Sequence, residues 1–344
     1  MNTGPMRAHL ARIMELHFDP KWGAPYWLER APELGFDPRR HVTSIEDLDR
    51  FGPMPAGLLA ERPIEDFIPR RFHDRLPEFI TTETGGTTGP PKRTAFRKDE
   101  FEAAFIAPFL EAAARVRFPR NVHWLFIGPS GPHIIGKAAR ACAVAMGSVD
   151  PFMVDFDPRW ARRLPGDSLA RTRYLDHVLA QAEAVLRSQH IGVLFATPPV
   201  LRVLGERLEQ PLREAITGIH LGGMALDTEF RKNLTAAWFP NAVALSGYGN
   251  SLAGMCPQLK YDPDAPPEYY PYGHRLVLRV DAPEGAARGR VRFHRLDESA
   301  LLPNVIERDE AAPVIHEIQA PGFQREGVRD PLPADAPNQN IGLY

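Results

Sequence analysis

A regular alternation of short apolar runs and helical patterns between residues 122 and 249 is the feature that most constrains the fold. Each apolar run ends at a glycine- or proline-rich break and is followed by apolar residues at helical spacing. Strands that alternate with helices at this spacing predict a parallel sheet covered by helices on both faces. The runs expected to form strands are Trp124–Ile127, Ile191–Ala196, Ile216–Leu221 and Ala242–Leu245.

Two glycine-rich breaks are expected at the carboxyl ends of successive strands. Gly222-Gly223 follows one run, and Ser246-Gly247-Tyr248-Gly249 follows the next. In open α/β sheets, ligands bind at this edge. A tyrosine between glycines suits a ligand with a flat ring, which would lie between the glycine backbone and the tyrosine phenol. The alternative is that both segments are tight strand–helix turns that bind no ligand.

A third glycine-rich segment, the loop from Thr84 to Lys92, precedes this pattern and follows an apolar and threonine-rich run. Glycines let backbone N–H groups approach an anion, and hydroxyls and an ammonium add donors, so the segment is a candidate polyphosphate loop. Pro90 and Pro91 separate the last glycine from the lysine, so it is not a Walker A loop. A flexible surface loop is the alternative. The candidate phosphate contacts are Thr84, Gly86, Thr87, Thr88, Gly89 and Lys92.

Composition excludes several classes of protein. The net charge of -2 over 344 residues argues against nucleic acid or an anionic membrane as the main partner. No apolar run approaches the roughly 18 residues that span a bilayer. Cys142 and Cys256 are the only cysteines, which excludes a disulfide framework and a cysteine-based zinc site. These observations predict a reduced, cytoplasmic protein.

The organisation expected along the chain has four segments. A helical lead-in packs on an α/β nucleotide-binding body, and alternating runs around residues 275–296 predict an antiparallel β segment after it. The chain then becomes polar and proline-spaced. The predicted boundaries are 1–75 for the lead-in, 76–254 for the body, 255–310 for the antiparallel segment and 311–344 for an irregular tail.

Taken together, the motifs resemble those of the adenylate-forming enzymes, namely acyl-CoA synthetases, peptide-synthetase adenylation domains and luciferases. The loop from Thr84 to Lys92 is similar to the family's phosphate loop, with Gly85 in place of serine. Segments similar to four further motifs follow in the family's order. They are Pro132-His133-Ile134-Ile135-Gly136, Gly222-Gly223-Met224-Ala225-Leu226, Gly247-Tyr248-Gly249-Asn250-Ser251 and Pro303–Asp309.

The resemblance implies a fold and a set of roles. The fold would be the large N-terminal part of such an enzyme: parallel sheets covered by helices, plus a small antiparallel segment. Lys92, His133 and Ser251 would serve catalysis, with His133 beside the substrate carboxylate and Ser251 at the α-phosphate. A core or turn histidine is the alternative for His133. The residues expected around adenine and ribose are Gly222, Gly223, Met224, Tyr248, Gly249 and Asp309.

The chain departs from the family pattern at two places. Leu252 occupies the position of a glutamate that binds Mg²⁺ in the family, and an aliphatic side chain cannot coordinate a hard cation. The cofactor implied is therefore ATP, with Mg²⁺ held by ligands that the sequence leaves unknown. The sequence also contains no lysine after Lys260, so the mobile C-terminal domain with its adenylation lysine is expected to be missing.

The resemblance thus predicts an ATP-dependent ligase that converts a small carboxylic acid to an acyl-adenylate. Coenzyme A, a carrier protein or a downstream reductase would be the acceptor, with no nucleic-acid or membrane partner. The lead-in and compact size are closest to phenylacetate-CoA-ligase-like enzymes, especially the small ligases of griseoluteate-type phenazine antibiotic pathways. Trp124, Phe126 and Phe195 suit an aromatic acid or simply core packing. The alternatives are a catalytically impaired protein that binds a nucleotide or acyl-adenylate, and a scaffold without a ligand.

Overall fold

The computed structural model describes residues 4–86, 89–166, 168–316 and 320–334, and contacts divide the described chain into two compact units. The first unit contains residues up to 104, residues 251–254 and residues 270–334. The second contains residues 105–250 and 255–269. The first unit is built from three separate stretches of the sequence. The predicted boundaries divide the chain into consecutive segments and do not describe such a unit.

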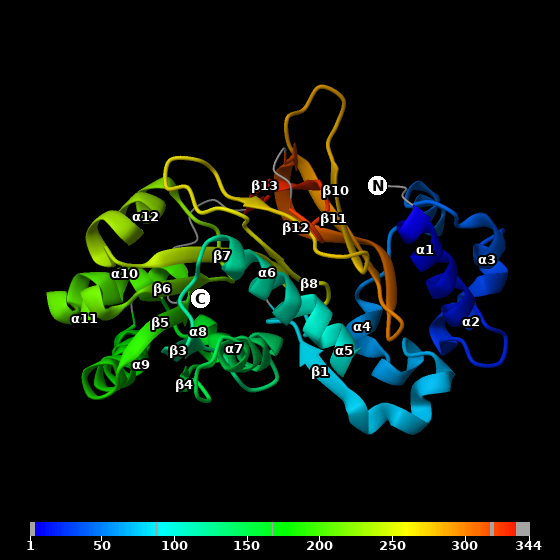
Figure 1. Ribbon diagram of the computed structural model, residues 1–344. Helices are drawn as coiled ribbons and strands as arrows, with labels where there is room; N and C mark the ends of the chain where they lie inside the picture. The colour runs from blue at the N-terminus through cyan, green and yellow to red at the C-terminus, as the bar shows by residue number, and fades with distance from the viewer. Residues whose placement is uncertain (1–3, 87–88, 167, 317–319, 335–344) are drawn as a thin grey trace. The chain divides into compact units, whose positions relative to one another are not determined.

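A six-stranded sheet with the order β4-β3-β5-β6-β7-β8 forms the centre of the second unit (Figure 1). The β4–β3, β3–β5, β5–β6 and β6–β7 pairs are parallel, as the alternation of strands and helices predicts. Prediction and structure agree on the location of the four expected strands. The strands are β3 (His123–Gly128), β4 (Phe152–Asp155), β5 (Ile191–Ala196), β6 (Gly218–Leu221), β7 (Val243–Asn250) and β8 (Gly254–Pro257).

Helices cover both faces of this sheet. One face packs on α9, α10 and α12 (Figure 1). On the other face, the ring of Phe109 from α6 contacts Trp124 and His220. Alternating residues of each strand therefore enter different layers. The helices of this unit are α6 (Ala107–Arg115), α7 (Ile134–Ala145), α8 (Pro158–Arg163), α9 (Leu169–Ser188), α10 (Pro198–Arg207), α11 (Gln210–Ala215) and α12 (Thr228–Asn233).

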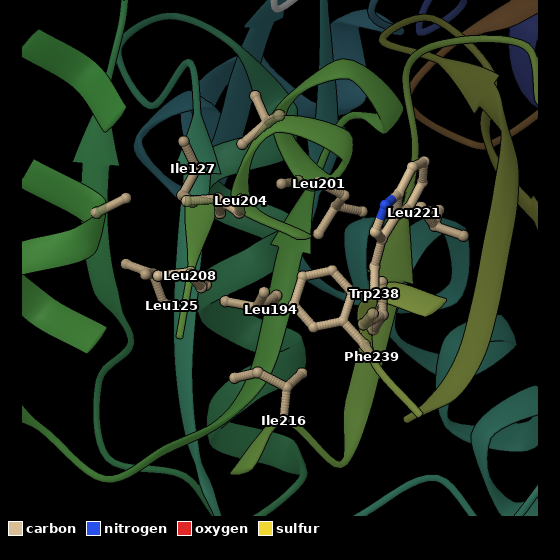
Figure 2. Close-up of a cluster of buried hydrophobic side chains, with 14 of the residues drawn as sticks. Leu125, Ile127, Leu194, Leu201, Leu204, Leu208, Ile216, Leu221, Trp238 and Phe239 are labelled. Atoms are coloured by element: carbon tan, nitrogen blue, oxygen red, sulfur yellow. The ribbon is translucent and has the colours of Figure 1, made fainter. Parts of the chain in front are cut away.

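The largest apolar cluster lies between the sheet and α9, α10 and α12. Figure 2 shows Leu125 and Leu194 from the strands beside Leu201 and Leu204 from α10. Trp238, at the end of a π-helical turn (Leu234–Trp238) that continues α12, closes one side of the cluster. Burial of these side chains supplies the main favourable term for folding of this unit.

Polar side chains accept hydrogen bonds from backbone N–H groups at the starts of two helices. Asp227 accepts from the backbone N–H of Phe230 at the start of α12, and Ser168 accepts from Arg171 at the start of α9. These bonds satisfy amides that a helix cannot pair internally. His133 holds the equivalent position before α7 without a side-chain cap.

In one respect the second unit differs from the prediction. The Gly247-Tyr248-Gly249 segment does not end its strand, because β7 continues to Asn250. Parallel pairing with β6 extends only to the Leu221–Ser246 pair, and the strand beyond it lies next to β8. A Cβ atom on Gly247 would lie 2.7 Å from Sδ of Met255 in β8, so this glycine permits close approach of a strand rather than a turn.

In the first unit, strands β10 to β13 form an antiparallel sheet in that order. The predicted hairpin is present as β10 and β11, and β1 pairs with β2 in a separate antiparallel ribbon. A short strand, β9 (Glu268–Tyr269), belongs to the second unit. The bounds are β1 (Phe79–Glu83), β2 (Arg93–Arg97), β10 (Leu276–Asp281), β11 (Gly289–Leu296), β12 (Leu301–Ile315) and β13 (Glu326–Pro333).

The prediction of an irregular segment after residue 311 is wrong for the described part of it. β12 continues to Ile315, and β13 pairs with it antiparallel, with Val328 opposite Pro313. Prolines suggested an interruption, but proline is tolerated in a strand where its nitrogen is not required as a donor. The prediction for residues 317–319 and 335–344 lies outside the described residues.

The helical lead-in packs on this antiparallel sheet through hydrogen bonds as well as apolar contacts. Trp27 Nε1 donates to the carbonyl of Leu301 at 3.0 Å, and Asn304 Nδ2 donates to the carbonyls of Leu48 and Gly52. The α-helices of the first unit are α1 (Gly4–His17), α2 (Pro25–Arg30), α3 (Pro38–His41), α4 (Leu58–Glu61) and α5 (Lys98–Phe101). Its 3-10 turns are Ala31–Glu33, Glu46–Phe51, Ile64–Asp66 and Arg70–Glu78. Among the described helices, none is long and apolar enough to cross a membrane.

Packing in the second unit predicts the effect of one glycine substitution. Gly205 lies in α10, where alanine is intrinsically preferred over glycine by about 0.5–1 kcal/mol. A Cβ atom there would lie 2.4 Å from Cγ of Trp238, which is itself buried. We therefore expect Gly205→Ala to lower the free energy of unfolding by about 1–3 kcal/mol despite its helix propensity, as measured by denaturant unfolding.

Gly131→Ala is the matched control, because a Cβ atom there meets nothing within 4 Å. We expect it to change the free energy of unfolding by less than about 0.5 kcal/mol. Equal stability of the Gly205→Ala variant and the native protein would show that α10 and the π-helical turn do not pack as described.

Candidate functional site

The ends of the candidate phosphate loop are joined by two hydrogen bonds. The backbone N–H of Thr84 donates to the carbonyl of Lys92 at 2.9 Å, and the N–H of Lys92 donates to Oγ1 of Thr84 at 3.0 Å. These bonds extend the β1–β2 ladder by one step beyond the Glu83–Arg93 pair. The segment is therefore a loop with a closed stem, although Thr87 and Thr88 lie outside the described residues.

Backbone conformation explains one glycine of the loop. Gly86 has a φ of 65°, in the left-handed region, and a Cβ atom there would lie 3.1 Å from Pro91 Cγ and 3.3 Å from the carbonyl of Gly89. A side chain at position 86 is disfavoured both by conformation and by space. This glycine keeps the loop compact above its stem.

The segment that contains Ser251 and Leu252 belongs to the same unit as the loop. Ser251 is partly exposed in a turn, whereas Leu252 is only 3% exposed. The carbonyl of Leu252 accepts from Arg295 Nη1 at 3.2 Å, and the carbonyl of Ala253 accepts from Arg275 Nη1 at 2.7 Å. Two guanidinium groups therefore fix the backbone of residues 252–253.

These guanidiniums meet on one buried carboxylate. Arg275 donates to both oxygens of Asp297, at 2.9 and 2.6 Å, and Arg295 Nε donates to Oδ2 at 2.6 Å. Burial alone would raise the pKa of Asp297, but the two arginines reverse that effect and lower its pKa. Burial lowers the pKa of Arg295, an effect that Asp297 opposes.

A second carboxylate lies beside this group. Glu100 accepts from the N–H groups of Ser299 and Arg97, at 2.9 and 3.0 Å. Burial and the neighbouring Asp297 raise its pKa, against the effect of Arg295. With two guanidiniums and two carboxyl groups, the cluster is neutral when Glu100 is ionised and positive when it is protonated.

Asp309, the predicted ribose ligand, lies in β12 opposite Pro333 of β13. Its side chain is 19% exposed, and its Oδ1 atom lies 3.8 Å from Nε of Arg308. The carboxylate is thus on a regular strand of the first unit and partly accessible, and its contact with ribose stays a prediction.

The second unit holds the predicted adenine contacts. Gly222 and Gly223 follow β6, and Tyr248 follows the paired part of β7, so both segments lie at the carboxyl edge of the parallel sheet. The Tyr248 ring is partly exposed and lies 5.7 Å from the ring of Tyr269 at an interplanar angle of 37°. Met224 is partly exposed and Gly249 exposed on the same two segments.

Support for Tyr248 comes from a buried hydrogen bond. The hydroxyls of Ser246 and Tyr269 lie 2.7 Å apart, and the N–H of Gln258 donates to the Ser246 carbonyl at 2.9 Å. This pair holds the ring of Tyr269 beside that of Tyr248. A fixed neighbour limits the orientations of Tyr248 and favours a preformed flat surface.

His133 lies between β3 and α7 at the same sheet edge and is 7% exposed. A Cβ atom on Gly136 would lie 2.6 Å from Cα of Ser130, so the helix start approaches the loop after β3 closely. His133 therefore lies on a constrained turn. Its predicted contact with a substrate carboxylate stays a prediction.

The aromatic residues considered for an aromatic acid pack with one another. Trp124 and His220 contact Phe109, and Phe195 contacts both Phe126 and His220 at ring distances of 5.3 and 4.2 Å. All are buried in the layer between the sheet and α6. Core packing is their observed role.

The described residues do not fit a resident Mg²⁺ site. Among them there is no group of three or more His, Cys, Asp or Glu side chains that could hold a metal ion. Leu252 offers no ligand atom on its side chain, and its carbonyl is bound by Arg295. A hard cation requires several oxygen ligands, so no step of the chemistry below depends on a metal held by these residues.

The predicted site residues thus fall into two groups. The candidate phosphate and ribose contacts that the structure describes lie in the first unit, and the adenine and carboxylate contacts in the second. Their ligand contacts stay predictions. The first group is Thr84, Gly86, Gly89, Lys92, Ser251 and Asp309, and the second is His133, Gly222, Gly223, Met224, Tyr248 and Gly249.

Sequence reasoning missed the buried cluster around Arg295, although a signal was present. Burial alternates along β11, so that Gly289, Val291 and Phe293 face inward, and Arg295 continues that inward series. A charged residue at an inward position of a strand requires a buried partner. None of the motifs described above contains Arg295, so they do not indicate the cluster.

The fold is shared with solved structures of an acyl-CoA ligase. A structure of 2-hydroxyisobutyryl-CoA ligase in complex with 2-HIB-AMP and CoA matches with a TM-score of 0.65 at 15% identity, covering 95% of this chain and 66% of the ligase chain. Its open conformation, also with 2-HIB-AMP and CoA, matches with a TM-score of 0.65 at 14% identity, covering 94% and 72%. Its complex with R3-HIB-AMP matches at 0.59 and 13% identity, covering 95% and 65%.

At the level of sequence, the chain matches no protein-family profile and no curated protein. It spans about two thirds of the length of the ligase in these structures. Similarity at this level of identity concerns the fold. It confirms the predicted fold class, a parallel sheet covered by helices together with a smaller antiparallel sheet.

Buried histidines predict how stability depends on pH. Burial lowers the pKa of His220 from 6.5 to about 4, against the opposing effect of its hydrogen bond to Leu245, and burial lowers that of His17 to a similar value. The unfolded chain therefore takes up protons between pH 6.5 and 4 that the folded chain does not. Above pH 6.5 both histidines are neutral in the folded and unfolded chain, and the free energy of unfolding is highest with respect to them. It should fall as the pH drops towards 4, by at most about 1.4 kcal/mol per pH unit for each histidine.

We expect His220→Gln, which keeps a donor for the carbonyl of Leu245 but does not titrate, to flatten this pH dependence. Urea unfolding at pH 7.5, 6, 5 and 4.5 measures the slope for both proteins. An unchanged slope in the variant would contradict the burial of a neutral imidazole at this position.

Proposed function

We propose that this protein is an ATP-dependent carboxylate ligase of the adenylate-forming type, which converts a small carboxylic acid to an acyl-adenylate. The proposal is supported by the fold, which is shared with a ligase whose structure holds 2-HIB-AMP and CoA. The observation that carries it is the glycine- and threonine-rich loop whose stem is closed by two hydrogen bonds. Independently, two glycine segments lie at the carboxyl edge of a parallel sheet, where ligands bind in open α/β sheets.

In this proposal the first unit supplies the phosphate contacts. Backbone N–H groups of the loop, the hydroxyl of Ser251 and the ammonium of Lys92 would bind phosphate oxygens, and Asp309 would accept from the ribose hydroxyls. Each is the donor or acceptor that its partner requires. Adenine would lie against the ring of Tyr248, beside the backbone of Gly222 and Gly223.

The chemistry is a displacement at phosphorus. A carboxylate oxygen of the substrate attacks the α-phosphorus of ATP, the bond to the bridging oxygen breaks, and pyrophosphate leaves with the electron pair. The protein lowers the barrier by holding the two anions in line and by neutralising charge on the phosphates. His133 would orient the carboxylate at the start of α7.

The acceptor and the acid are finer parts of the proposal. We propose coenzyme A as the acceptor, by analogy with the ligase structure that contains it. The resemblance of the motifs and lead-in to phenylacetate-CoA-ligase-like enzymes favours a small aromatic acid. A phenazine-type pathway would be a special case of this class.

Tyr248 provides a direct test of nucleotide binding. AMP at 100 times its dissociation constant should stabilise the native protein by about 2.7 kcal/mol, which is measurable as a thermal shift. Tyr248→Ala should weaken AMP binding by about 1–3 kcal/mol, the usual contribution of a base stacked on an aromatic ring. Tyr248→Phe keeps the ring and should bind AMP as the native protein does. Equal binding by all three would exclude stacking on this residue.

ATP–pyrophosphate exchange tests catalysis. We expect exchange with at least one acid from a panel of aromatic, 2-hydroxy and short aliphatic acids, and loss of exchange in the Lys92→Ala variant if its ammonium neutralises phosphate charge. Nucleotide binding without exchange for any acid would favour the alternative of a protein that binds a nucleotide or acyl-adenylate but has lost the reaction. Absence of both would overturn the proposed function.

A further inference from the structure

All five N–H donors of one buried arginine are bonded. Arg295 is fully buried in the first unit, and its Nε donates to Asp297 at 2.6 Å. Nη1 donates to Oγ1 of Thr94 at 3.0 Å and to the carbonyl of Leu252 at 3.2 Å. Nη2 donates to the carbonyl of Ala95 at 2.7 Å and to Oγ of Ser299 at 3.0 Å. A guanidinium has five donors in a fixed plane, so its acceptors are fixed relative to one another.

Two of these acceptors lie on the strand that leaves the candidate phosphate loop. Thr94 and Ala95 belong to β2, two and three residues after Lys92. Lys92 is in turn joined to Thr84 by the two hydrogen bonds of the stem. The position of the guanidinium is therefore transmitted through one short, paired strand to both ends of the loop.

A third acceptor lies next to the other predicted phosphate contact. The carbonyl of Leu252 directly follows Ser251, and the next carbonyl, that of Ala253, is held by Arg275. Arg275 and Arg295 share Asp297, so their relative position is also fixed. Residues 94–95 and 252–253 are far apart in sequence, yet both pairs are bonded to this pair of guanidiniums.

The remaining contacts hold the arginine itself in place. Its guanidinium carbon lies 3.7 Å from the centroid of the Phe96 ring, within the range of a cation–π interaction. The Nε2 atom of His17 lies 2.9 Å from the carbonyl of Asp297 and would donate to it. Asp297 is thus held from its carboxylate and from its backbone, and Arg295 has little freedom to move.

We propose that Arg295 is a positioning residue for the bound phosphates, because it aligns the stem of the Thr84–Lys92 loop with the backbone beside Ser251. The inference rests on the proposed function for the identity of the ligand. It requires no contact between Arg295 and the nucleotide. In this proposal the stem of the loop and the backbone beside Ser251 move together, and the phosphate contacts are lost when these two segments separate.

The decisive variant is Arg295→Lys, which keeps the charge but offers three donors instead of five, so at least two acceptors lose their partner. Arg290→Lys is the matched control, since it is the same substitution on the same strand, and Arg290 donates from Nη1 to the carbonyl of Arg308 at the surface. Thr94→Val removes a single acceptor with little change of volume and serves if Arg295→Lys does not fold.

Affinity for ATP is compared with affinity for adenosine, which lacks phosphates. In Arg295→Lys we expect the preference for ATP over adenosine to fall about tenfold, while the dissociation constant of adenosine changes less than about twofold. Thr94→Val should cause a smaller loss in the same direction, and Arg290→Lys none. A purely structural role would weaken both ligands equally, and that result, or an unchanged preference, would overturn the proposal.

Amide hydrogen exchange provides a readout without ligand. Exchange in Arg295→Lys should rise at residues 93–96 and at residues 251–254 together, relative to Arg290→Lys. A rise at only one segment, or at neither, would contradict the coupling. If the native protein binds neither ATP nor adenosine, the proposed function fails, and hydrogen exchange alone then decides whether Arg295 couples the two segments.

Discussion

The buried ion group of Arg275, Arg295 and Asp297 is the constraint on which the organisation of the first unit depends. Removing such charges from water is costly, and their mutual attraction repays the cost only when geometry and hydrogen bonding are nearly complete. Here the carboxylate accepts three bonds and Arg295 donates all of its five. Apolar residues of similar volume often stabilise a core equally well, so stability alone does not explain the group. The ion group also fixes the positions of the backbone segments that it joins relative to one another.

That specificity matters because the first unit is assembled from three separate stretches of chain. Residues 251–254 enter it as a short segment between two parts of the second unit, and Leu252 and Ala253 are buried in it. Their backbone carbonyls are the groups that the arginines bind. Hydrogen bonds to charged donors are stronger than neutral ones, so these bonds add to burial in fixing the backbone of a segment of only four residues.

The second unit illustrates how much follows from hydrophobic pattern. Apolar runs of four to six residues predicted the parallel strands β3, β5, β6 and β7, since strands buried on both faces need continuous apolar sequence. The parallel strand β4 at the edge of the sheet was not predicted. The same pattern could not locate the end of β7. A glycine in the sequence indicates a strand end equally well when it allows a turn and when it allows another strand to approach closely. Only the position of Met255 in β8 distinguishes the two at Gly247.

The candidate site was predictable to the extent that local sequence determines it. A glycine- and threonine-rich loop and glycines at strand ends can be recognised residue by residue, because their function depends on backbone conformation. Arg295 could not be recognised in that way, since three of its five acceptors lie on residues 201, 200 and 43 positions earlier in the chain. Proline similarly misled the interpretation of β13, where pairing with β12 outweighs local propensity.

Leu252 shows how the cluster affects the chemistry available to this chain. Its buried side chain and its bound carbonyl leave no oxygen of this residue to hold a cation. The charged groups bonded to this backbone are guanidiniums, and Lys92 lies at the end of a loop whose stem one of them orients. The guanidiniums are buried and balanced by Asp297 and Glu100, so in the proposal the charge that a phosphate group meets is the ammonium of Lys92. In the proposed reaction, charge neutralisation by this ammonium depends on the alignment of two segments, and the five bonds of Arg295 set that alignment.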